Sequence, residues 1–191
     1  MAAHQNGTTQ NQLTPTNAAT AVTHPALQLS GQVAAVVNAA GDLHLDDSNT
    51  FVAIAHQNVT FNDGGGVVFV AGKDFQLTNG GCAGIAAGRD FALRNGGSGF
   101  VLAGRDVSFA NGEGAITVAG QRATAAGHQS AFIAAREVEL HQSKAGVIVA
   151  GNVTLDDNAT VVVEVTPERI AGALVGLLFY LPVRLLQRLR G

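Results

Sequence analysis

The chain has 191 residues, of which 24 are Gly, 47% are hydrophobic and only 13% are charged. A hydrophobic content this high excludes a chain kept unfolded by charge, and a single Cys excludes a disulfide framework and a cysteine-based zinc site. Residues 1–165 carry thirteen acidic and seven basic side chains, a balance that argues against nucleic acid as a partner.

The first 25 residues are rich in Asn, Gln, Thr and Ala, and they include Pro15 and Pro25, which interrupt regular structure. This composition predicts a polar N-terminal arm over 1–25, either flexible or folded over the first repeat as a cap. The arm does not open with a charged stretch followed by an apolar one. We therefore expect no secretory signal and a cytoplasmic location.

Residues 26–165 repeat with a period of 16, and Ala-Gly pairs recur at 71–72, 87–88, 103–104 and 119–120. Two apolar rows follow this period, with 15-residue steps near the end, and a largely polar row lies between them. Apolar, polar, apolar is the alternation of a strand with one buried face. The first row is Leu27, Leu43, Val59, Phe75, Phe91, Val107, Ala123, Val138 and Val153, and the second is Leu29, Leu45, Phe61, Leu77, Leu93, Phe109, Ala125, Leu140 and Leu155.

A second strand is expected in the other half of each repeat, because Asn-Gly and Ala-Gly-basic-acidic segments separate the two halves as turns. We expect the rows that contain Val52 and Ile54 to face inward, and the row between them to face outward. An exposed apolar stripe indicates an interface, although the C-terminal segment could fold back and cover it. The candidate self-association residues on this stripe are Val37, Phe69, Ile85, Val101, Phe132 and Val147.

The repeat decides the fold class. A helix is excluded because Asn-Gly interrupts the pattern every 16 residues. A meander of hairpins is the alternative, but its successive strands would not need similar residues in the same rows. If each repeat coils onto the one before it, similar side chains of successive repeats lie next to each other at a spacing of about 4.8 Å. We therefore predict an all-β fold, a single-chain parallel β-solenoid of about nine 16-residue coils over 26–165.

In these stacked repeats the chain resembles the bactofilins, small bacterial cytoskeletal solenoids that polymerise end to end and sit on the membrane. The Ala-Gly-x-Asp and Asn-Gly elements are also similar to repeats of haemagglutinin-type adhesins. The 16-residue coil is a little shorter than the usual coil of either family. The resemblance covers about 140 residues, implies a scaffold or filament, and carries over no site residue.

Side chains capable of catalysis or metal binding are few in the repeats. Lys73, Arg89 and Arg105 lie beside acidic residues, and we expect these charges to be solvated turn residues rather than a track for an anionic polymer. The six His lack metal-ligand spacing, and Cys82 is expected to be a small turn residue. Enzymes built on related coils need grouped acids, bases or His at a groove. We expect no catalytic site, no metal and no cofactor.

The segment 166–191 begins with Thr166 and Pro167, which favour a helix start, and predicts a C-terminal α-helix. Its uncharged run 170–183 would be about 21 Å long, short of the ~30 Å hydrocarbon core. We expect a membrane anchor at the inner leaflet, with a short tilted span or packing on protein as alternatives. Gly172 and Gly176 could pack helices closely. The anchor residues are Leu174, Leu177, Leu178, Phe179, Leu181, Arg184, Arg188 and Arg190.

Together these patterns predict a non-enzymatic scaffold that assembles with copies of itself and binds anionic lipid at the cytoplasmic face of the cell membrane. An alternative is an accessory subunit that uses the apolar stripe to hold a different protein in a membrane-associated complex. A surface adhesin is disfavoured because no export signal is expected.

Overall fold

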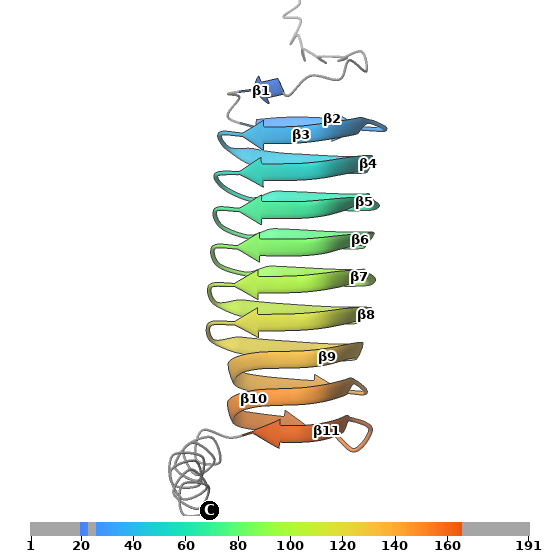
Figure 1. Cartoon of the computed structure of the whole chain (residues 1–191), viewed down its shortest axis with the longest axis vertical. Coiled ribbons are helices and arrows are strands. Elements are labelled where there is room, and N and C mark those ends of the chain that lie inside the picture. Colours follow the sequence, from blue (N-terminus) through green and yellow to red (C-terminus); the bar gives the residue numbers. More distant parts are fainter. Residues whose placement is uncertain (1–19, 23–25, 166–191) are drawn as a thin grey trace, which may run out of the picture.

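The computed structural model describes residues 20–22 and 26–165, and it places them in one stack of β-strands (Figure 1). The strands form a single 11-stranded sheet that winds around the axis of the stack. They are β1 Thr20–Val22, β2 Ala26–Ser30, β3 Val33–Ala39, β4 Asp42–Ala55, β5 Val59–Ala71, β6 Phe75–Ala87, β7 Phe91–Ala103, β8 Asp106–Ala119, β9 Arg122–His141, β10 Lys144–Leu155 and β11 Thr160–Val165.

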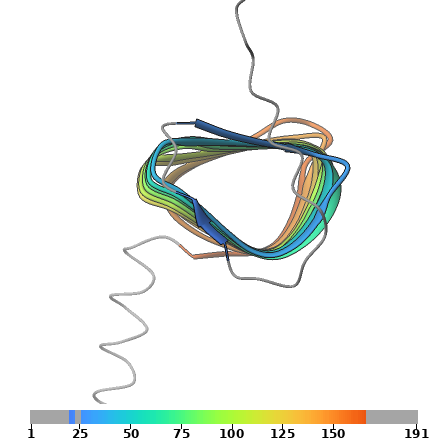
Figure 2. The same ribbon diagram turned by 90° about the horizontal axis from the view of Figure 1, so that it is seen from above.

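Each coil pairs in parallel with the next, and equivalent residues lie side by side. In the middle of the stack Val59 pairs with Phe75, which pairs with Phe91. Figure 2 looks down the axis and shows the coils superimposed around one closed, roughly triangular outline. The prediction of a parallel β-solenoid with about nine coils of about 16 residues is confirmed.

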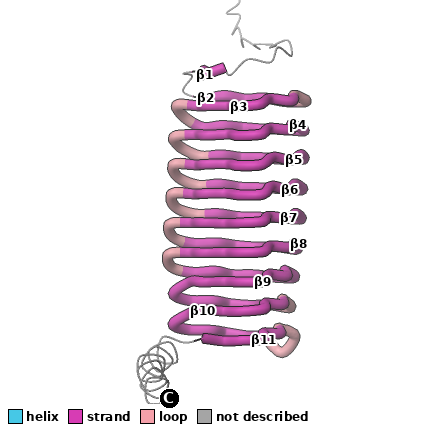
Figure 3. Tube along the Cα trace, in the orientation of Figure 1, coloured by secondary structure: helices cyan, strands magenta, loops and turns pink. Residues whose placement is uncertain are grey.

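Each coil has three sides, which we number by their order along the chain. In β5, side 1 is residues 59–62, side 2 is 64–66 and side 3 is 68–71. Figure 3 shows that strands occupy almost the whole of each coil, and that over β4 to β8 the loops are confined to one corner, where side 3 leads to the next side 1. Side 2 is a third, short strand segment that the sequence analysis did not separate from the Asn-Gly turn.

One residue with positive φ makes the corner between side 1 and side 2. Asn95, for example, has φ of 52°, and the following Gly96 leads directly into the next paired segment. A Cβ on Gly96 would lie 2.1 Å from the carbonyl oxygen of Gly80 in the preceding coil, so stacking requires glycine there. The corner residues with positive φ are Gly31, Asp47, Asp63, Asn79, Asn95, Asn111, Gly127 and Gln142.

The interior is filled by the two apolar rows that the sequence predicted on side 1. Every member from Leu43 to Leu140 is buried. Five Phe rings form a continuous aromatic ladder inside the coils, with neighbouring centroids 5.1–5.8 Å apart, and it ends where the ring of His128 stacks on Phe109 at 4.0 Å. The Phe rings of this ladder are Phe61, Phe69, Phe75, Phe91 and Phe109.

The predicted facing of side 3 is wrong. As far as β8, the row expected to point outward lies in the core, with Val101 fully buried, and the two rows expected inside point to the surface. Of the six candidate self-association residues, Val37, Phe69, Ile85 and Val101 are buried. Phe132 and Val147 pair with each other in a neighbouring outward row and are half-buried.

The physical reason for this error is that side 3 is apolar on both faces. Alternation therefore gives no contrast between inside and outside there. The predicted stripe also placed its first 15-residue step one coil too early, just before Phe132. On side 3 Thr117 pairs with Ile133, a step of 16, and the step of 15 comes one coil later, between Ile133 and Ile148.

Candidate functional site

The outward surface of side 3 is an apolar face made of two parallel rows. We call them row A and row B, and together they form the apolar face. Asn38 is the one polar residue among them. Row A is Val36, Val52, Val68, Gly84, Phe100, Ile116, Phe132, Val147 and Val163. Row B is Asn38, Ile54, Val70, Ala86, Leu102, Val118, Ala134, Val149 and Val165.

The largest side chains on this face are substantially open to solvent. Phe100 is 42% exposed and Leu102 is 44% exposed, although both belong to a regular strand of the stack. Nine coils at about 4.8 Å, with about four residues across, give a footprint of roughly 500 Å². A contiguous apolar patch of that size is at the upper end of what monomeric proteins expose, and such patches are often functional.

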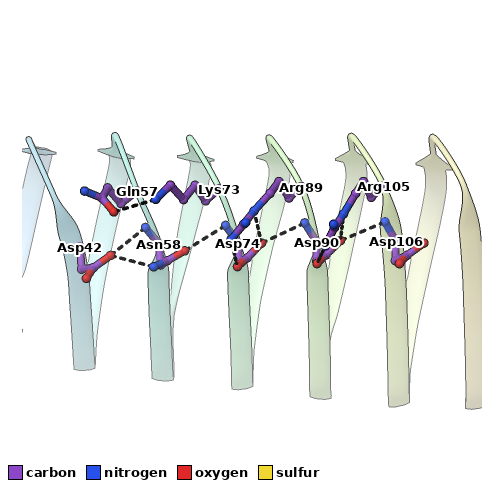
Figure 4. A network of polar contacts seen from close by, with 9 residues as sticks. All are labelled: Asp42, Gln57, Asn58, Lys73, Asp74, Arg89, Asp90, Arg105 and Asp106. Carbon is purple, nitrogen blue, oxygen red and sulfur yellow. Dashed lines mark hydrogen bonds and ion pairs between the residues drawn. The ribbon is translucent and has the colours of Figure 1, made fainter.

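At the corner between side 3 and side 1, polar side chains form a ladder that links successive coils (Figure 4). Each carboxylate or amide oxygen accepts the backbone N–H of the equivalent residue one coil later. The Asn58 N–H, for example, lies 3.0 Å from Asp42 Oδ1, and the Asp90 N–H lies 3.3 Å from Asp74 Oδ1. We call this the corner ladder, and its members are Asp42, Asn58, Asp74, Asp90 and Asp106.

Basic residues of this corner are paired with the ladder. Arg89 donates to Asp74 through Nη2 at 2.6 Å and Nε at 3.1 Å, and Arg105 makes the same two contacts with Asp90. The guanidinium of Arg105 holds the pKa of Asp90 below its usual value. Lys73 donates to Gln57 at 3.0 Å. These charges therefore hold adjacent coils in register, which agrees better with structural turn charges than with a track for an anionic polymer.

Two groups with reactive side chains are turned into the stack. His128 is buried and stacked on Phe109, and this burial lowers its pKa to about 4, with the backbone of Gly112 opposing the shift only in part. Cys82 packs against the core, and burial raises the pKa of its thiol to about 12. At neutral pH Cys82 therefore stays a protonated thiol, which is a poor nucleophile. His128 stays a neutral imidazole whose low pKa makes it a weak base.

Other polar residues do not gather into a metal site. Over residues 20–22 and 26–165, no group of three or more His, Cys, Asp or Glu is arranged to hold a metal ion. A shallow, open groove follows side 2 near the C-terminal end of the stack. It is lined by Glu113, Gln129, Lys144 and Thr160 together with small residues.

The predicted anchor and helix-packing residues, from Gly172 to Arg190, lie outside the described residues, as does most of the predicted N-terminal arm. Within the part of the chain that the structure describes, no helix is both long enough and apolar enough to cross a membrane.

Comparison with known proteins adds no identification. No protein-family model, no curated protein and no solved structure matches the chain. The family resemblance seen in the repeats therefore extends as far as the parallel β-solenoid itself, and the argument about function rests on the apolar face and on how the polar residues are used.

Proposed function

We propose that this protein is a non-enzymatic structural scaffold, a β-solenoid that assembles with copies of itself and is held at the cytoplasmic face of the cell membrane by residues 166–191. The observation that carries this proposal is the apolar face, which runs the length of the stack and is apolar in all but one position. Leaving such a surface in water is costly, and covering it with another surface removes that cost.

The distribution of polar groups supports a structural role. The charged side chains of the corner ladder are engaged with neighbouring coils, and the most buried titratable groups are neutral parts of the core. Enzymes concentrate perturbed acids and bases in a cleft. Here the groups with shifted pKa values, such as Asp90 and His128, join adjacent coils or pack in the core, which supports a structural role.

The last described coils of the stack favour association as well. β11 is the last strand of the described sheet, and it covers only part of β10. Leu155, at the end of β10, is 42% exposed although its counterpart Leu140 is buried. Backbone edges of this kind can pair with a further strand.

The attachment to membrane rests on sequence. Residues 170–183 are uncharged, and Arg184, Arg188 and Arg190 follow them. Apolar burial and attraction to anionic lipid would both contribute, the second at about 1 kcal/mol for each basic residue near the surface. A different protein on the apolar face is the alternative function, in which the chain is an accessory subunit.

Vesicle flotation tests the membrane part of the proposal. The full chain should float with anionic vesicles, and deleting 166–191 should leave it in the soluble fraction. Replacing Arg184, Arg188 and Arg190 with Gln should weaken binding to anionic vesicles and change binding to neutral vesicles little. A matched control replaces Lys73, Arg94 and Arg136 of the solenoid with Gln, which removes the same charge and should leave flotation unchanged. A full chain that floats with neither kind of vesicle contradicts the attachment.

A further inference from the structure

Gly84 interrupts row A for no reason that a single copy of the fold supplies. A Cβ built on Gly84 meets no atom within 4 Å, and its backbone φ is not in the left-handed region. Many other glycines of the stack are required by contact, as at Gly88, where a Cβ would lie 2.2 Å from the carbonyl oxygen of Gly72. The fold would accept a larger residue at Gly84, as every other position of row A carries one.

The missing side chain gives the apolar face a distinct relief. On β6 the outward residues are Gly84 and Ala86, which leave a hollow. On the adjacent strand β7 the outward residues are Phe100 and Leu102, which project and are among the most exposed apolar side chains of the face. Two small residues and two large ones therefore lie side by side, in the same two rows.

We propose that the apolar face is the interface of a two-fold symmetric dimer of this chain, in which the two stacks run in opposite directions and Phe100 and Leu102 of each copy fill the hollow over Gly84 and Ala86 of the other. The inference deepens the proposed self-assembly, on which it rests, by naming the surface and the partner. Self-complementary patches are what a two-fold interface requires, because each residue must meet its counterpart twice.

The symmetry axis would lie in the interface, parallel to the strands and between β6 and β7. Row A then faces row A and row B faces row B. β5 faces β8, where Val68 meets Ile116, and β4 faces β9, where Val52 meets Phe132. With the stacks parallel instead, each coil would face its own equivalent. Phe100 would then oppose Leu102, and Gly84 would oppose Ala86, which leaves one crowded layer and one void.

The size of the face suits a dimer. The apolar face of each copy covers roughly 500 Å², so a dimer would bury about 1,000 Å² in total. This is the lower bound for a specific interface, and the side chains that project from the face add to it. Phe51, Val67 and Val162 stand at the adjoining corner, are exposed, and can extend the contact. The near absence of polar residues is typical of permanent homodimers rather than of transient complexes.

The first experiment compares Gly84→Phe with Gly81→Phe in the full chain, purified in detergent micelles, with protein mass measured by sedimentation and light scattering. Gly81 is on the same strand but on side 2, and a Cβ there would lie 3.7 Å from its nearest neighbour. Both variants should keep the wild-type circular dichroism. We expect Gly81→Phe to dimerise like wild type and Gly84→Phe to raise the dimer dissociation constant about 30-fold or more, because it blocks the central contact.

The second experiment reads the orientation with a thiol crosslinker of about 10 Å reach, the separation of two packed sheets. All proteins carry Cys82→Ala. Mixing Val68→Cys with Ile116→Cys should give a covalent heterodimer, since these positions face each other when the stacks are opposed. Mixing Val68→Cys with Val70→Cys should give none. The reverse result means that the stacks are parallel and contradicts the inference.

Other outcomes separate the inference from the proposed function. If Gly84→Phe assembles as well as Gly81→Phe, another surface makes the contact, so the inference is wrong and the scaffold proposal stands. If the wild-type chain is monomeric in detergent and also on vesicles, self-assembly itself is wrong. If the chain dimerises only after 166–191 are removed, that segment covers the face in the intact protein, which contradicts the inference.

Discussion

His128 shows how one residue adapts to the interior of the stack. It occupies the position that glycine holds in the four preceding coils, and its ring extends the aromatic ladder beyond Phe109. Neither ring nitrogen makes a hydrogen bond of normal geometry, and the residue is 1% exposed. The backbone of Gly112 would offset only part of the cost of burying an imidazolium here, so the folded state favours the neutral ring.

This requirement makes stability depend on pH. The pKa of His128 falls from 6.5 to about 4 on folding, so its contribution is complete above about pH 6.5 and is lost as pH falls toward 4. The loss amounts to roughly 3 kcal/mol of unfolding free energy. Urea denaturation at pH 7 and pH 4.5 measures it. His128→Phe should remove most of the difference, whereas an unchanged difference would mean that other groups, such as Asp90, cause the pH dependence.

At the scale of the strand, β7 shows what alternation can and cannot predict. On side 1, Ala92 lies between the apolar residues Phe91 and Leu93. Its equivalents in the neighbouring coils, Gln76 and Ser108, are polar, so the buried face of side 1 was identified correctly. On side 3 Phe100, Val101 and Leu102 are all apolar. Nothing in that run distinguishes the residue that packs in the core from those that face outward.

Two substitutions of the same residue type on β7 test this facing. Phe91 lies between Phe75 and Phe109, with centroids 5.8 Å away on each side, so Phe91→Ala should leave a cavity and cost about 3–5 kcal/mol of unfolding free energy. Phe100→Ala removes an exposed ring and should cost less than about 1 kcal/mol in the monomer. Urea denaturation at protein concentrations low enough to exclude pairing gives both values. Equal losses would show that the assigned facing is wrong.

The corner ladder is also a property of elements rather than of single residues. Its hydrogen bonds and ion pairs all join one coil to the next, and Asn58 replaces Asp without interrupting the series. The sequence indicated turn charges in adjacent rows. It did not indicate that the carboxylates accept backbone N–H groups, because that depends on the three-dimensional offset between coils.

For the whole molecule, the 16-residue period was sufficient to predict the solenoid, since successive coils repeat apolar inward residues and, through the middle of the stack, a corner Asn or Asp followed by Gly. The apolar face was predicted to exist, but as far as β8 its residues were assigned one position away, and only Phe132 and Val147 of the six candidates lie on it. The open space around Gly84 could not be predicted from the sequence. Only the three-dimensional structure distinguishes a glycine that a neighbouring carbonyl requires from one with room for a side chain.

If this solenoid builds multi-copy assemblies, electron microscopy of the full chain on anionic vesicles should reveal them. Paired stacks should join further where the strand edges at their ends pair with those of another copy. We predict filaments or sheets on wild-type vesicles, and their loss or narrowing with Gly84→Phe. Dispersed, uniform single particles at all protein concentrations would contradict the account and favour an accessory subunit that binds a different protein.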